Sequence, residues 1–336
     1  MGRMNFNLRT GALVWFLLLL LFIVSSCSPL VVVESHELVP VEVNRSIVDA
    51  LPHDSSLVAL IYPRFVTVRD ASQFMADDEL VLAVRVGEQQ KIYPLSILLW
   101  HEVINDNLSG VPFVVTYCPI CGSAAAFNSE VVVAGKKKVL LFNTSGKVYD
   151  SSMLFQDTIA GYDGNGSNDN DSDVLSSLFV SFNGTAISGP RAGLILKPVT
   201  SSVGFYRDFV ATKPDSLVLS RETGYNLPYG SDPYASFYSN SALLLPVAHV
   251  DSRLGLKQVV VGVRIGDVER AYPTYELEKV GVISDSVAGV DIRIERDETG
   301  FIRVVKRETG EVVTFSRTFW FLWATHNPMT TVYGMS

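Results

Sequence analysis

The chain has 336 residues, of which 48% are hydrophobic and 18% are charged. This apolar content is enough to bury a core, which excludes a wholly disordered protein. The net charge of −8 argues against a duplex nucleic-acid binder, which needs a basic face, so we expect no nucleic-acid partner. Three cysteines are too few for a disulfide-stapled scaffold. Composition bounds the class but identifies no reaction, so it leaves open whether the protein is an enzyme.

The N-terminal segment has the features of an export signal. Two arginines precede an apolar run at residues 12–24, which is too short to cross a hydrocarbon core of ~30 Å. Small residues then lead to Cys27, as in a lipobox, whose cysteine is lipidated. We predict a signal peptide over residues 1–27 and a tether over 28–50, with an ordinary cleaved signal or an uncleaved signal anchor as alternatives. The rest of the chain is then expected on the extracytoplasmic face of the membrane, lipid-anchored, or secreted.

An excess of glycosylation sequons agrees with export. Six of the 14 asparagines stand in Asn-x-Ser/Thr, where the Ser/Thr frequency predicts about two. These candidate acceptors are Asn44, Asn107, Asn143, Asn165, Asn170 and Asn183. Serine-rich loops could also generate sequons that are never modified, so the sequence leaves both interpretations open.

An internal repeat organises the rest of the chain. Residues 81–111 align with residues 260–290 at a constant offset of 179, with 12 identities in 31 positions. In the first copy, residues 80–93 predict a hairpin, and apolar spacing predicts a helix over Leu95–Val103. Val111 to Tyr117 is a candidate buried strand.

These features predict an α+β fold that is rich in antiparallel strands. Two related copies of one hairpin–helix–strand unit would share a single globule. The first copy is expected over residues 51–225 with an inserted loop at 161–173, a connector follows over 226–258, and a degenerate second copy takes 259–336.

The sequence Cys118-Pro-Ile-Cys121-Gly is the strongest chemical motif. Its spacing is that of a zinc-ribbon knuckle, but a ribbon needs two knuckles and the chain has one, so a metal would need further ligands. His101 is the best candidate, because the second copy has Val280 at its place and neither cysteine recurs there. We therefore predict a metal site of Cys118, Cys121 and His101, for Zn²⁺ or for Cu(I) as a soft ion.

The same two cysteines admit other interpretations. Cys-x-x-Cys is also the spacing of thiol–disulfide oxidoreductases, so Cys118 and Cys121 could form a redox pair that exchanges electrons with partner proteins. They could instead form a structural disulfide within a cell-surface binding module, or one of them could act as a nucleophile with His101. The sequence identifies no protein partner and no substrate.

The motifs together resemble a known family. Trp100-His101-Glu102-Val-Ile-Asn-Asp106, Thr116-Tyr-Cys-Pro-Ile-Cys-Gly-Ser-Ala124 and Ser188-Gly-Pro190 are similar to the domain of unknown function DUF3179. The resemblance covers most of residues 51–332. The resemblance implies that this stretch folds as one family domain, and it points to the same histidine and cysteines as the motifs do. It implies no reaction.

Overall fold

The computed structural model describes residues 47–49, 57–133, 135–157, 176–245, 247–298 and 300–335. The expected signal peptide, most of the tether and the inserted loop lie outside these described residues. Four candidate modification sites also lie outside them, namely Cys27, Asn44, Asn165 and Asn170. Those expectations stay predictions. In the described part of the chain, no helix is long and apolar enough to cross a membrane.

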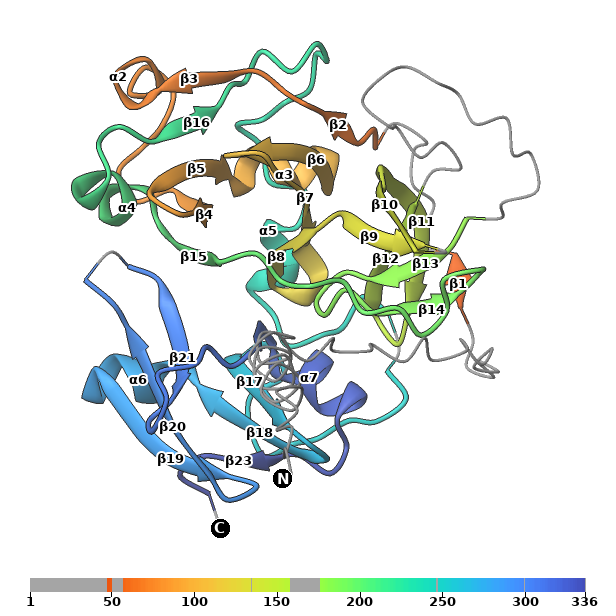
Figure 1. The fold of residues 1–336 in the computed structure, drawn as a ribbon, viewed down its shortest axis with the longest axis vertical. Coiled ribbons are helices and arrows are strands. Elements are labelled where there is room, and N and C mark those ends of the chain that lie inside the picture. The colour runs from red at the N-terminus through yellow and green to blue at the C-terminus, as the bar shows by residue number, and fades with distance from the viewer. Residues whose placement is uncertain are drawn as a thin grey trace, which may run out of the picture. The chain divides into compact units, whose positions relative to one another are not determined.

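The structure is built from sheets. Strands make up 45% and helices 15% of it, and five small sheets are arranged as a five-bladed β-propeller (Figure 1). The expected α+β fold of two hairpin–helix–strand copies is therefore wrong. Helices of at most seven residues among those described cannot form a layer of their own, so sheets supply most of the core.

One sheet is built on the predicted hairpin of the first copy. Strands β4 (Leu80–Val86) and β5 (Gln89–Pro94) pair antiparallel around a turn at Gly87, whose φ of +57° favours glycine. The full order is β15–β4–β5–β16–β3, so later segments flank the hairpin. The strands that flank the hairpin and the helices beside them are β3 (Phe65–Thr67), α2 (Val68–Ala71), β15 (Ser201–Phe205), α4 (Tyr206–Thr212) and β16 (Leu217–Leu219).

The next sheet carries the cysteine motif. Helix α3 (Leu95–His101) starts directly after Pro94, close to the predicted helix, and leads into the meander β6–β7–β8. Side chains alternate along β7, so Val114 and Cys118 enter one apolar cluster while Val115 and Tyr117 enter another. The strands of this sheet are β2 (Leu60–Ile61), β6 (Val103–Leu108), β7 (Val111–Cys118) and β8 (Ser123–Asn128).

The second repeated segment has the same local element order in two further sheets, β22–β17–β18–β23 and β19–β20–β21. Val81 lies opposite Pro94 in the first segment, and Val260 lies opposite Pro273 in the second. The elements are β17 (Val259–Ile265), β18 (Val268–Pro273), α6 (Thr274–Val280), β19 (Val282–Val287), β20 (Val290–Arg296), β21 (Ile302–Lys306), β22 (Phe315–Phe319), α7 (Trp320–His326) and β23 (Thr331–Val332).

The fifth sheet has the order β1–β11–β12–β13–β14, and a separate hairpin pairs β9 with β10. Phe142, Phe155 and Phe179 meet edge to face or stacked inside it, at centroid distances of 5.0 to 5.4 Å. The elements are β1 (Val48–Asp49), β9 (Glu130–Val133), β10 (Lys136–Val139), β11 (Phe142–Tyr149), β12 (Ser152–Asp157), β13 (Leu178–Val180), β14 (Ala186–Ser188) and α5 (Ala235–Tyr238), which lies outside the sheets.

The fold prediction failed at the step from hairpins to sheets. The apolar run and the turn at Gly87 predict β4 and β5, but their sheet is completed by strands far along the chain, such as β15, in which Ser201 lies opposite Val84. The spacing of residues in the sequence carries no signal for which distant strand will pair with the edge of a hairpin.

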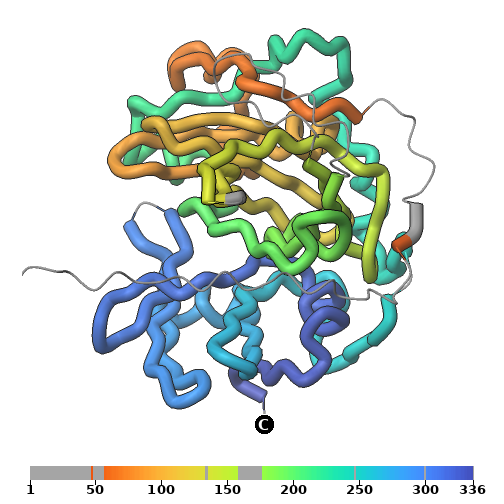
Figure 2. The backbone as a smooth tube through the Cα atoms, turned by 45° about the vertical axis from the view of Figure 1, so that its right-hand side comes forward, coloured from red at the N-terminus to blue at the C-terminus, as the bar shows by residue number. Residues whose placement is uncertain are grey.

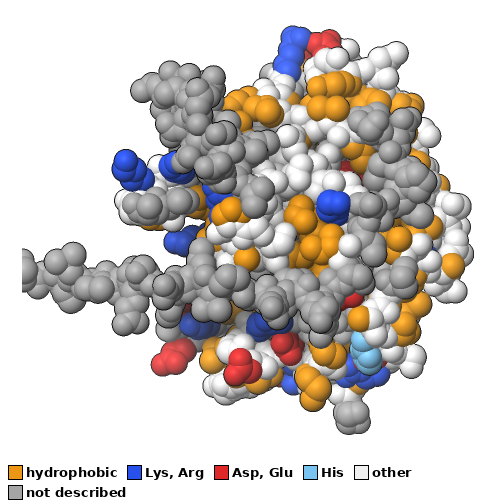
Figure 3. All heavy atoms as spheres, turned by 90° about the vertical axis from the view of Figure 1, so that its right-hand side faces the viewer, with side chains coloured by type: hydrophobic (Ala, Val, Ile, Leu, Met, Phe, Trp, Pro, Cys, Tyr) orange, Lys and Arg blue, Asp and Glu red, His pale blue; other side chains and the backbone are white. Residues whose placement is uncertain are grey.

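On the surface drawn in Figure 3, hydrophobic side chains lie in several small groups among polar atoms.

Candidate functional site

The cysteine motif forms a tight turn between two strands. β7 ends at Cys118, the single 3₁₀ turn η1 (Pro119–Cys121) follows, and β8 begins at Ser123. Proline suits the first position of the turn, and Gly122 leaves it with a φ of +62°. Cys118 and Cys121 are joined by a disulfide, and both side chains are fully buried. The turn is therefore closed covalently inside an apolar cluster.

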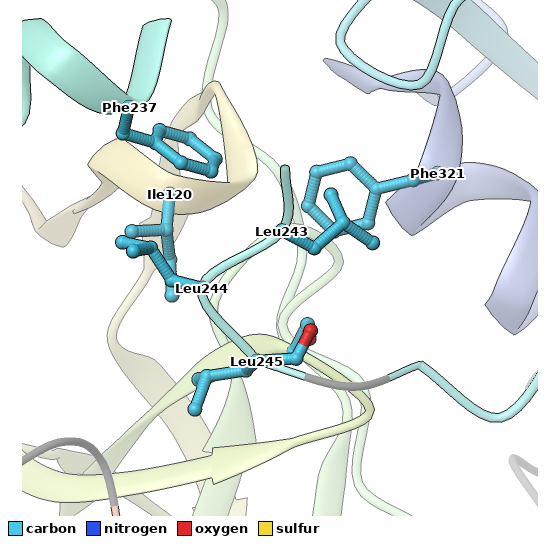
Figure 4. A pocket seen from close by; sticks show the side chains of 7 residues that line it. Ile120, Phe237, Leu243, Leu244, Leu245 and Phe321 are labelled. Atoms are coloured by element: carbon cyan, nitrogen blue, oxygen red, sulfur yellow. The ribbon is translucent and has the colours of Figure 1, made fainter. Parts of the chain in front are cut away.

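Two neighbouring segments cover this turn. The Thr318 hydroxyl of β22 donates a hydrogen bond of 2.8 Å to the carbonyl oxygen of Cys121. On the other side, Leu244 lies beside Ile120, one of the two residues between the cysteines, and Leu243 lies beside the Phe321 ring (Figure 4). The disulfide is thus shielded from the surface, which does not favour exchange with a partner protein.

His101 lies at the end of α3 and is fully buried. Its Nδ1 lies 2.7 Å from the carbonyl oxygen of Val58, and its Nε2 lies 2.7 Å from the Tyr229 hydroxyl. Because a carbonyl only accepts, Nδ1 carries the proton and Nε2 accepts from the tyrosine. Burial lowers the pKa of His101, which agrees with this neutral form. The ring therefore joins two loops to α3.

The structure does not bring the three predicted metal ligands together. Both nitrogens of His101 have protein partners, and Cys118 is bonded to Cys121. Among the described residues, no group of three His, Cys, Asp or Glu side chains could hold a metal ion. The Zn or Cu site stays a prediction without support from this geometry.

Glu102, which follows His101, has an unusual environment that the sequence motifs did not reveal. Its side chain is only 6% exposed, and burial raises the pKa of its carboxyl group to about 8. Its backbone φ is +57°, a value that side-chain-bearing residues rarely adopt. The one available signal was the replacement of Glu102 by Gly281 in the second copy.

Two tyrosines interact with Glu102. The backbone N–H of Tyr117 donates to the carbonyl oxygen of Glu102 at 2.8 Å. Burial, and next the charge of Glu102, raise the pKa of Tyr234 to about 12. Tyr117 is hydrogen-bonded to Tyr238, and burial raises the pKa of both. Asp232 adds a negative charge that acts on all three phenols.

A large cavity of about 760 Å³ is lined in part by Arg317, which interacts electrostatically with Tyr117. Its walls come from β8, the stretch 195–203, β17, β21, β22 and α7, which belong to both halves of the repeat. In Figure 2, the green stretch around residue 200 passes close to the blue second copy. The aromatic lining residues are Phe127, Phe182, Phe301, Phe315 and Trp323. The cationic ones are Arg85, Lys197, Arg264, Arg303 and Arg317.

Positive charge dominates this cavity. Asp297 is the one carboxylate among its described lining residues. Arg264 is partly neutralised, because it pairs with Glu269 at 3.0 Å and donates to Asn327. Arg317 differs, since its guanidinium forms no close ion pair or hydrogen bond with a described residue, and Tyr117 and Glu278 act on it only through their charge. Burial, and next the like charge of Arg296, lower the pKa of Arg317 to about 10.

Two of these cationic residues stand at equivalent positions of the internal repeat, but the repeat by itself does not show that they line a cavity. Arg85 and Arg264 occupy equivalent repeat positions, and both line the cavity. The cysteine motif also contributes, because β8 follows it and the buried Ser123 hydroxyl lines the cavity with no hydrogen-bond partner among the described residues. The motif therefore positions a cavity wall.

The described glycosylation candidates differ in access. Asn107 is exposed at the end of β6, and its side chain accepts from the Gly110 amide at 3.1 Å. Asn143 and Asn183 are half-buried, and Asn183 lines the cavity. Modification at any of them stays a prediction, with Asn107 best placed to receive a glycan.

Comparison with known proteins identifies one relative group. A family model described as protein of unknown function, DUF3179, matches residues 56–316. No curated protein and no solved structure matches the chain. The matched range contains the disulfide turn and β8, together with most of the cavity lining.

Proposed function

The chain belongs to the DUF3179 family, and we propose that it is a binding protein for an anionic small molecule with an apolar body. The ligand occupies the cavity between β8 and β22, and the disulfide has a structural role. The protein works outside the cytoplasm, as the predicted export signal and the sequons suggest. This proposal develops the binding-module alternative for the cysteine motif.

The charge of the cavity is the observation that carries the proposal. Five cationic side chains face one carboxylate in a space whose size suits a small-molecule ligand. Such a wall attracts anions, and its aromatic side chains give an apolar body a surface to contact. The chain as a whole has a net charge of −8, so its composition does not explain the excess of positive charge in this cavity.

Two polar groups are placed to hold the anion itself. Arg317 on β22 and Ser123 on β8 both line the cavity. The buried Ser123 hydroxyl has no hydrogen-bond partner among the described residues, and the half-buried Arg317 side chain forms no hydrogen bond with them. A buried donor without a partner is costly, so a bound anion would satisfy Ser123 and would also pair with the charge of Arg317. The metal and thiol-exchange hypotheses have no comparable support, since their residues are separated or shielded.

The test uses 8-anilinonaphthalene-1-sulfonate, an aromatic sulfonate that becomes fluorescent on binding. We expect saturable binding by the wild-type protein and a Kd about tenfold higher for Arg317→Gln, because a charge-assisted hydrogen bond of about 1.5 kcal/mol is lost. Arg317→Lys, which keeps the charge but not the planar fork, should fall between them.

The matched control is Arg307→Gln, which removes an exposed arginine that does not line the cavity. Its Kd should stay within about twofold of wild type. Circular dichroism should show that all variants are folded, since partly unfolded proteins also bind this dye. Equal affinities of wild type and Arg317→Gln, or binding that is independent of salt, would contradict the proposal.

A further inference from the structure

Strand β8 is the last strand of its sheet, and the chain covers only part of its outer edge. Residues 197–199 run antiparallel to the end of β8, where the Val199 N–H donates to the Ala126 carbonyl oxygen at 2.8 Å. From Ser201 onwards the chain pairs with β4 instead and forms β15 (Figure 1). No strand is therefore hydrogen-bonded to the outer edge of β8 at its first residues.

The peptide groups at this uncovered part of β8 point away from the sheet. The Ser129 N–H donates to the Pro112 carbonyl oxygen of β7 at 3.1 Å. Because peptide groups alternate in direction along a strand, the odd-numbered residues of β8 bond to β7, and Ala124 and Ala126 face the open side. The N–H and carbonyl groups of Ala124 form no hydrogen bond with a described residue. Ala124 lines the cavity, so a ligand there can reach both groups.

Strand β15 presents a second open edge to the same cavity. The Arg85 N–H of β4 donates to the Thr200 carbonyl oxygen at 2.9 Å. By the same alternation, the peptide groups of Ser201 and Val203 point away from β4. Both residues line the cavity, and their peptide groups bond to no described residue. The cavity therefore begins where β15 separates from β8, between two edges that lack a partner strand.

The side chains at this place indicate the charge of the missing partner. The Ser123 hydroxyl at the start of β8 lines the cavity, is 2% exposed and has no hydrogen-bond partner among the described residues. Five cationic side chains and one carboxylate line the described wall. An extended peptide with a carboxylate offers both kinds of group, because its backbone matches a strand edge and its charge matches the arginines.

We propose that the ligand of this cavity is a short acidic peptide, which binds in an extended conformation as an added strand at the open edge of β8. This inference rests on the proposed function, since it names the class of anion that the same cavity takes. The peptide backbone bonds to Ala124, and its carboxylate lies at Ser123 and Arg317. Residues 197–199 already pair with β8 in this way, and the ligand continues their pairing where the chain turns away.

Calorimetric titration with two synthetic peptides tests this mode of binding. The first is acetyl-Ala-Val-Ala-Glu with a free terminal carboxylate, and the second has the same sequence with the two central amide nitrogens methylated. The wild-type protein should bind the first saturably and the second at least about tenfold more weakly, because methylation removes backbone donors without changing the charge. Equal Kd values for the two peptides would overturn the proposal.

A protein variant tests the same hydrogen bonds from the other side. Ala124→Pro removes the N–H that faces the cavity, and proline is tolerated where the N–H of an edge strand points outwards. It should bind the unmethylated peptide about tenfold more weakly than wild type, whereas the control Arg307→Gln should stay within about twofold. Circular dichroism checks that the variants are folded. Should Ala124→Pro not fold, the comparison of the two peptides decides.

The sulfonate dye separates this inference from the proposed function. A wild-type protein that binds 8-anilinonaphthalene-1-sulfonate through Arg317 but does not bind the peptide would overturn the peptide proposal and leave the anion cavity in place. Binding of neither ligand would overturn both.

Discussion

Glu102 shows at the scale of one residue how burial changes chemistry. The pKa of its carboxyl group is ordinarily 4.5 and rises to about 8 in the folded protein, and burial is the cause. In the folded state it is therefore mainly protonated at neutral pH, whereas it ionises in the unfolded chain. His101, its neighbour, responds in the opposite direction, because burial lowers the pKa of a base.

This difference predicts a pH-dependent stability. Between about pH 4.5 and pH 8 only the unfolded state releases the Glu102 proton, so the free energy of unfolding falls as the pH rises through this window. Glu102→Gln has no such proton. Relative to wild type, we expect its stability to rise across the window by on the order of 4 kcal/mol and to level off above it.

Urea denaturation at several pH values measures this difference. Taking the variant minus the wild type cancels the contributions of the other titrating groups, His101 among them. Two stability profiles that run parallel from pH 4.5 to pH 8 would show that Glu102 ionises normally in the folded protein.

At the scale of elements, the turn between β7 and β8 depends on Gly122. A Cβ atom added there would come within 2.7 Å of the Phe319 ring on β22, and the backbone φ is +62°. We expect Gly122→Ala to cost about 2 to 3 kcal/mol, from the clash and from the strained backbone together. Gly87→Ala is a matched control, since its φ is +57° and nothing lies within 4 Å.

The control should cost only about 1 kcal/mol, because it carries the backbone strain without the clash. Chemical denaturation of both variants measures the two values. Similar losses would mean that Phe319 moves aside easily, and that the contact between β8 and β22 is not tightly packed.

The disulfide belongs to the same element, and its expected role is structural. It closes a short loop between Cys118 and Cys121, for which chain entropy alone gives about 2 kcal/mol of stabilisation. The double variant Cys118→Ala/Cys121→Ala should lose about this amount in urea denaturation. Dithiothreitol should lower the stability of the wild type towards that of the variant, and should leave the variant unchanged. If the double variant were as stable as the wild type, the disulfide would have no stabilising role in the fold.

At the scale of the molecule, a propeller of small sheets brings distant strands to common walls. β8 of the first copy and β22 of the second face the same cavity, although almost 200 residues separate them in the chain. The repeat places Arg85 and Arg264 there from equivalent positions. The net negative charge of the chain is thus distributed unevenly, and the cavity is a local exception.

The candidate site was only partly predictable, because the fold brings together residues that are far apart in the sequence. The sequence pointed to His101 and to both cysteines, because they occur in one copy of the repeat. It suggested that they converge, whereas His101 binds Val58 and Tyr229, and the cysteines bind each other. Presence in one copy marks a residue as special but carries no information about which side chains meet in space.

The sequence by itself determined the local features of this protein. The apolar run that precedes the turn at Gly87 and the strand residues that follow it specify the β4–β5 hairpin, and the aligned repeat specifies a second hairpin of the same register. The family also follows from motifs within the chain. Only the tertiary structure decided the propeller, the cavity and the partner of each buried polar group. Turns and periodicity act over a few residues, whereas sheet edges and cavity walls join segments whose distance along the chain leaves no local pattern.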